Sequence, residues 1–140
     1  MPGQIPAYVF TLICEDIRTE EGSKLSLLGT YSENIFFKDH PMRMRSLAFY
    51  NRFSGGKGTF LLTVKLKSFS GELAKGVEIK DASFPKSKDS ELTNIVTVIG
   101  NVEFKEEGLH QYEMYFDDIP DPVVRVPFGV YMKREAFGAG

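Results

Sequence analysis

The alternation of hydrophobic and polar residues is clearest between Leu47 and Phe69. In the second arm of this stretch, apolar residues occupy every second position: Phe60, Leu62, Val64 and Leu66. Threonines and lysines lie between them, with Leu61 as the exception. A period of two is typical of a half-buried β-strand. The first arm is rich in aromatic residues, and the link S-G-G-K-G supplies glycines for a turn. We therefore expect residues 47–69 to form a long antiparallel hairpin.

Strand patterns recur in further segments that are separated by turn-forming residues: 7–14, 25–37, 77–82, 94–104, 110–116 and 123–132. Together with the arms of the hairpin they amount to seven to eight strands. No segment has the length and period of an amphipathic helix. We therefore expect an all-β fold, a two-sheet antiparallel β-sandwich of immunoglobulin-like type.

Residues that share one parity within a strand are expected to form the core. This criterion selects Phe60, Leu62, Val64, Leu66, Val96, Val98, Tyr112, Met114, Phe116, Val124 and Val126. Gly29 suggests a bulge or bend within segment 25–37. Pro127 cannot donate to a ladder, so the last strand is expected at a sheet edge or with a bulge near Gly129.

The apolar run from Ala7 to Cys14 carries no charge, proline or glycine that would protect an exposed strand edge. Two placements remain open. The run lies inside a sheet, or it forms an edge that another chain covers.

Length and composition point to one domain. The chain has 140 residues and 15.8 kDa, which suits a single β-sandwich domain over residues 1–140, with a flexible leader at 1–6 and a flexible tail at 134–140. The net charge is −2 and the basic residues are scattered, so we expect no nucleic-acid partner. A single cysteine favours a reducing compartment. With neither a signal-peptide pattern nor a membrane span, the expected location is the cytoplasm, without a membrane partner.

Candidate chemistry is sparse. Three acids, Asp117, Asp118 and Asp121, lie close enough in sequence to hold a calcium ion, but a solvated turn stiffened by prolines is the preferred interpretation. The Gly-Gly-Lys-Gly link departs from the phosphate-binding pattern. Cys14 is expected to be a packing residue. We therefore predict no catalytic residue, no cofactor and no metal, and those three acids are the only candidate metal ligands.

The stretch from Ile13 to Tyr31, ICEDIRTEEGSKLSLLGTY, combines an acidic, arginine-containing strand end with a turn and a Leu-Ser-Leu-x-Gly-x-Tyr strand. It resembles the opening of a family of short bacterial proteins of unknown function. The resemblance implies a bacterial or phage-associated cytoplasmic β-domain, and it implies no activity, ligand or catalytic residue.

The function expected from these features is a non-catalytic protein-binding or assembly module. Its partner would be another protein, or a second copy of the chain bound through a sheet edge. Three tyrosines predicted opposite the core faces, Tyr50, Tyr115 and Tyr131, are the candidate contact residues. The alternative is a ligand-binding sandwich, for a carbohydrate or a calcium-dependent target, that uses the Asp117–Asp121 loop. An enzyme is the third possibility and has no motif to support it.

Overall fold

The computed structural model describes residues 3–31, 34–71, 78–84 and 91–133. These residues form nine strands and one 3-10 turn: β1 (Ala7–Thr19), η1 (Glu21–Ser23), β2 (Leu25–Tyr31), β3 (Asn34–Phe37), β4 (Met42–Ser54), β5 (Gly58–Ser68), β6 (Glu78–Phe84), β7 (Leu92–Phe104), β8 (Gly108–Phe116) and β9 (Val124–Met132). The count exceeds the expected seven to eight because segment 25–37 is two strands, β2 and β3, that belong to different sheets.

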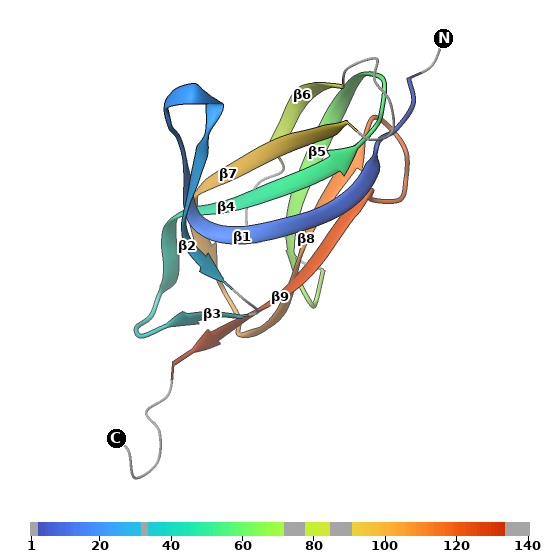
Figure 1. The fold of residues 1–140 in the computed structure, drawn as a ribbon. Coiled ribbons are helices and arrows are strands. Elements are labelled where there is room, and N and C mark those ends of the chain that lie inside the picture. The colour runs from blue at the N-terminus through green and yellow to red at the C-terminus, as the bar shows by residue number, and fades with distance from the viewer. Residues whose placement is uncertain (1–2, 32–33, 72–77, 85–90, 134–140) are drawn as a thin grey trace.

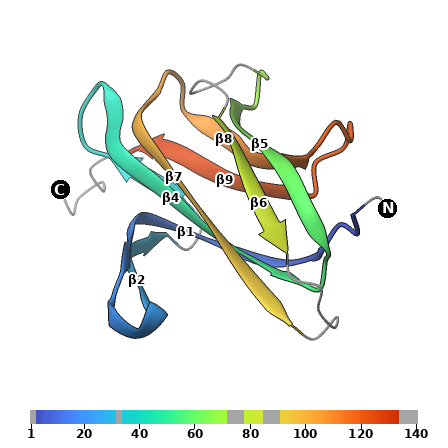
Figure 2. The ribbon, with the colours of Figure 1, turned by 90° about the horizontal axis from the view of Figure 1, so that it is seen from above.

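Two sheets pack face to face, which confirms the all-β, two-sheet architecture (Figure 1). The four-stranded sheet has the order β2-β1-β4-β7, and the five-stranded sheet has the order β3-β9-β8-β5-β6. Seen from above, β1, β4 and β7 form one layer, and β9, β8 and β5 the other (Figure 2).

One strand pair departs from the expected antiparallel arrangement. β3 pairs with β9 in parallel, from Asn34 opposite Gly129 to Phe37 opposite Met132. β3 reaches this sheet by crossing from the other one, so no hairpin dictates its direction.

The expected hairpin over residues 47–69 is wrong. β4 lies in the four-stranded sheet and β5 in the five-stranded sheet, so the glycine-rich link crosses between the layers. This link also holds the beginning of the chain, because Gln4 and Lys57 exchange two backbone hydrogen bonds of 2.8 Å. Alternation and glycines predict two strands and a turn, but they contain no information on whether the turn leads to a neighbouring strand or to the opposite sheet.

The predicted core is largely correct. The residues expected on β5 and β8, together with Val124, are buried, and Val126 packs partly buried against them. Val96 and Val98 are wrong, since Val98 is 43% exposed and the inward residues of β7 are Ile95, Thr97 and Ile99. The strand changes face at Asn101, whose φ of +50° interrupts the alternation, and Val102 and Phe104 are buried beyond it.

Candidate functional site

One lateral side of the sandwich is only half closed. β2 pairs with β1 from Ile13 to Thr19, and the chain then crosses to the other sheet, where β3 pairs with β9 from Gly129 onward. At one end of this side, β2 and β3 therefore extend the two sheets. At the other end, the first half of β1 and the first half of β9 have no described strand between them.

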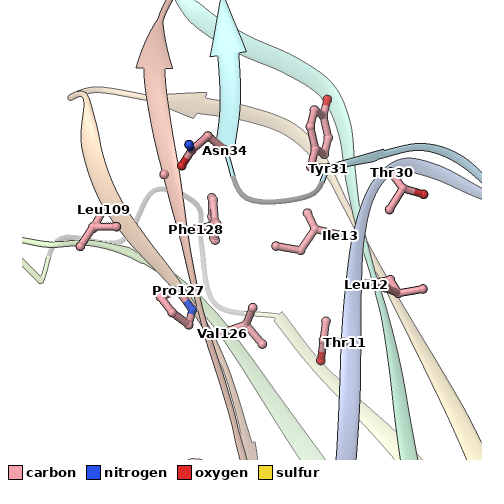
Figure 3. A pocket seen from close by; sticks show the side chains of 11 residues that line it. Thr11, Leu12, Ile13, Thr30, Tyr31, Asn34, Leu109, Val126, Pro127 and Phe128 are labelled. Atoms are coloured by element: carbon pink, nitrogen blue, oxygen red, sulfur yellow. The ribbon is translucent and has the colours of Figure 1, made fainter.

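A groove of about 470 Å³ opens at this position between β1 and β9 (Figure 3). Its volume is in the range of ligand-binding pockets. Thr11 and Ile13 of β1, and Val126 and Phe128 of β9, point into the gap. The lining consists of uncharged residues: Thr11, Leu12, Ile13, Thr30, Tyr31, Asn34, Leu109, Val126, Pro127, Phe128 and Gly129.

The backbone of β1 supplies one wall of the groove. Ala7–Cys14 pairs with β4 on one side, and β2 reaches the other side only from Ile13. The sequence left two placements open for this segment, inside a sheet or at an edge. The second half of β1 is internal, and the first half is an edge. The register slips between Tyr8 and Phe10, so this edge does carry a bulge, contrary to expectation. The regular part of the free edge is Phe10–Leu12.

The opposite wall is protected differently. Residues 124–128 of β9 pair with β8 alone, and β3 joins on the other side from Gly129. Pro127 lies in this one-sided stretch, as expected for a proline in a strand. Because Pro127 has no N–H group, this part of β9 has one hydrogen-bond donor fewer for an added strand than a regular stretch such as Phe10–Leu12 has.

A series of hydrogen-bonded polar side chains runs from exposed Tyr8 to buried Asn51 and stiffens the β1 wall. The hydroxyl of Tyr8 donates to Thr11 Oγ1 (2.9 Å), which donates to Asn51 Oδ1 (2.8 Å). Asn51 Nδ2 donates to the hydroxyl of Tyr112 (3.0 Å) and to the carbonyl of Ile95 (2.9 Å). Asn51 is fully buried, so these bonds satisfy groups that have no access to water.

Two titratable side chains at the groove and behind it, Tyr31 and His110, are neutral at pH 7. Burial, together with the Glu15 carboxylate beside its hydroxyl, raises the pKa of Tyr31 to about 12. His110 is buried against the rings of Phe104 and Phe128. Burial lowers the pKa of its imidazole because a charged ring would lose its hydration. The lining of the groove therefore carries no charge at neutral pH, and the carboxylate of Glu15 lies next to it, beside Tyr31.

The opposite side of the sandwich, between β6 and β7, contains a lysine. Lys80 lies opposite the buried Leu62 in the ladder, on the inner face of edge strand β6. Its Nζ donates to the backbone carbonyl of Val96 on edge strand β7 (2.6 Å). An inward-pointing charge of this kind is a known means of preventing edge-to-edge association.

The three tyrosines predicted as contacts do not come together. Tyr50 lies on the four-stranded sheet, and Tyr115 and Tyr131 lie on the five-stranded sheet. Tyr50 is only 8% exposed, because Phe10 stacks on its ring. The hydroxyl of Tyr115 donates to Glu113 Oε1 (2.8 Å). The ring of Tyr131 lies 6.2 Å from that of Phe36, which is 58% exposed.

The acidic loop has a structural role in at least one of its members. Asp117 Oδ1 accepts a hydrogen bond from the backbone N–H of Leu61 (2.8 Å), and Asp118 and Asp121 are exposed. In the described part of the chain, no three His, Cys, Asp or Glu side chains are close enough to hold a metal ion. Cys14 is buried, with its Sγ 3.8 Å from the carbonyl oxygen of Ala48.

The groove was not predicted from the sequence. Two signals pointed toward it, the apolar run that begins at Ala7 and the Pro127 to Gly129 step. Neither signal shows that the two segments face each other, because they are more than a hundred residues apart in the chain.

Comparison with known proteins gives a family. A family model described as "Family of unknown function (DUF6941)" matches residues 9–130, which confirms the resemblance to a family of unknown function. No curated protein matches the chain. Among the described residues, no helix is long and apolar enough to cross a membrane.

Proposed function

Since the chain belongs to the family of unknown function DUF6941, whose description assigns no activity, we propose that it is a non-catalytic protein-binding module that receives its partner in the groove between β1 and β9. The observation that carries this proposal is the difference between the two open sides of the sandwich. Lys80 occupies the β6/β7 side, whereas the β1/β9 side keeps an uncharged groove and a free backbone edge. Exposed edges favour association with other chains.

The proposal includes an immunoglobulin-like arrangement of strands. In that fold the second and fifth strands are neighbours in one sheet, and the third, sixth and seventh form the other. Here β4 and β7 are neighbours, and β5, β8 and β9 lie together with β6 added at the β5 side, as in variable-type domains. The stacked rings of Phe49 and Tyr112, 3.9 Å apart, join β4 to β8, the strand pair that a disulfide bridges in antibody domains.

The bacterial origin and the cytoplasmic location remain part of the same proposal. They are supported by the resemblance at the N-terminal segment and by the single, buried cysteine, which lacks an internal disulfide partner.

Site-specific photo-crosslinking tests the proposed function. A photoreactive amino acid replaces Leu109, at the groove, or Ile79, on β6 at the other side, in cells that produce the protein. Leu109 is 58% exposed and Ile79 is 62% exposed, so the two sites are matched in accessibility, and both replaced residues are aliphatic. We expect a small set of protein adducts from position 109 and none from position 79. Equal yields from the two positions, or none from either, would contradict the proposal.

A further inference from the structure

We propose that the groove between β1 and β9 binds an extended, uncharged peptide segment of another protein, which pairs antiparallel with Phe10–Leu12 and continues the line of β2. The inference rests on the proposed function and specifies the partner's conformation and chemistry. It is argued from the backbone of β1, the charge of the groove, the shape of the gap and the alternatives to β1 as the pairing edge.

The free edge of β1 favours a bound peptide with an extended backbone. In an antiparallel ladder, every second residue directs its N–H and its C=O to the same side. Along Phe10–Leu12, the N–H and C=O groups that point to one side pair with β4. The groups that point to the other side pair with β2 only from Ile13 onward. A peptide in line with β2 would extend that ladder, which is the recognition mode known as β-strand addition.

The lining of the groove favours a bound peptide with uncharged side chains. None of its lining residues is ionic, and Tyr31 remains protonated with a pKa of about 12. Away from Glu15, which lies beside Tyr31 at one end of the groove, burial of a lysine or a carboxylate would remove its hydration without supplying a counter-ion. The amide of Asn34 can accept or donate hydrogen bonds without introducing charge, whereas the hydroxyl of Thr11 already donates to Asn51 and accepts from Tyr8.

The shape of the gap favours a single strand. Successive side chains of a strand point to opposite faces, so every second residue of the peptide would enter between Ile13 and Phe128 and the others would face solvent. Because Val126 and Ile13 contribute apolar surface, the inward residues are expected to be aliphatic. A volume of about 470 Å³ holds a few such side chains and no folded domain.

The alternatives fit the geometry less well. Pairing along β9 would meet Pro127, which has no N–H group to donate. A second copy of the chain could offer the free edge of its own β1, but that strand is part of a sheet through its β4 and cannot enter a groove between two sheets. The bulge between Tyr8 and Phe10 would also limit such a ladder to the short regular run.

The probe for the test is a displayed library of random dodecapeptides, selected for binding to the full-length protein. We expect the selected peptides to alternate aliphatic residues with others and to lack charge at the aliphatic positions. Enrichment of charged or helical amphipathic peptides would overturn the inference.

Backbone N-methylation locates the binding edge. Cys14 allows chemical ligation of a synthetic Met1–Ile13 thioester to the remaining chain, so Phe10, Thr11 and Leu12 can each be N-methylated in the full-length protein. N-methylation of a residue whose N–H faces β4 should lower the melting temperature. At a residue that faces the groove, it should leave the melting temperature unchanged and weaken binding of the selected peptides at least tenfold.

The outcomes separate this inference from the proposed function. Equal peptide affinity for the unmodified protein and all three N-methylated proteins would refute strand addition, even if position 109 still crosslinks to a partner. Loss of crosslinking as well would refute the proposed function itself. A dimer in sedimentation equilibrium that dissociates on N-methylation would identify a second copy as the occupant and overturn the peptide assignment.

Discussion

On the β6/β7 side of the sandwich, a lysine reaches from one edge strand to the backbone of the other, whereas on the β1/β9 side two strand edges face an uncharged groove. Both sides arise from the same geometry, because two open sheets necessarily have edges. On the first side, the ammonium group of Lys80 occupies a carbonyl that an incoming strand would need. On the second, a bulge and Pro127 leave one regular stretch of β1 unprotected. The comparison indicates which edge is available for binding.

The largest expected loss of unfolding free energy is at Asn51, in the hydrogen-bonded series of polar side chains behind the β1 wall. Replacing Asn51 by alanine removes the partner of Thr11, Tyr112 and the Ile95 carbonyl, and it should cost roughly 2–4 kcal/mol of unfolding free energy. Tyr8→Phe, which removes only the exposed end of the series, should cost less than about 0.5 kcal/mol. Urea unfolding of both variants measures the difference. Similar losses would show that the wall is not held by this network.

The next effect concerns the protected side. Lys80→Met removes the donor to the Val96 carbonyl, and it should cost about 1 kcal/mol because the bond is charge-assisted but only partly shielded from water. It should also make the protein associate as its concentration rises, since the edge of β7 becomes accessible. Sedimentation velocity over a concentration series measures the association. The control is Lys65→Met, on the outer face of β5, and association in both variants or in neither would invalidate the comparison.

A smaller effect should appear with pH. The folded-state pKa of His110 is lowered by burial, so the unfolded chain binds more protons below the ordinary histidine pKa of 6.5. The stability that neutral His110 contributes should therefore be fully present above pH 6.5. The free energy of unfolding should fall as the pH decreases from there through the lowered pKa. Denaturant unfolding at pH 7.5 and pH 5.5 tests this expectation. His110→Gln should be less stable at both pH values and should lose the pH dependence over this interval, and a variant that keeps it would assign the effect to another group.

The smallest effects are expected at the two exposed aliphatic residues. Leu109→Ser and Ile79→Ser should each change the unfolding free energy by less than about 0.5 kcal/mol, because both side chains are mostly in water. Only Leu109→Ser should weaken binding of the selected peptides, as Leu109 alone lines the groove. A larger effect of Ile79→Ser would move the binding site to the other side.

Local pattern was sufficient for the parts of the fold that local physics determines. Side chains in a strand alternate between two faces. On β5 and β8 this alternation correctly identified the inward residues, which are Phe60, Leu62, Val64, Leu66, Tyr112, Met114 and Phe116. The all-β class and most strand positions follow from the same period. Pro127 was expected in an edge strand or beside a bulge, and this is correct only for the first part of β9, which pairs with β8 alone, because β3 pairs with β9 from Gly129 onward.

The same reasoning failed where one residue changes the local geometry. Asn101 adopts a positive φ, and the inward parity of β7 differs before and after it. Val98 and Val102 therefore share a parity in the sequence but lie on opposite faces. Asparagine is one of the residues that tolerates this conformation, but its presence does not require it.

Tertiary structure alone decided which strands are neighbours and where the sandwich is open. Ser54 to Gly58 has the composition of a hairpin turn, yet it joins the two sheets, because burial of both apolar faces depends on the whole set of strands. Local patterns were enough to predict apolar strands over residues 7–14 and 123–132. Their placement on either side of one groove depends on where β2 leaves β1 and where β3 joins β9, which are long-range pairings that no local pattern encodes.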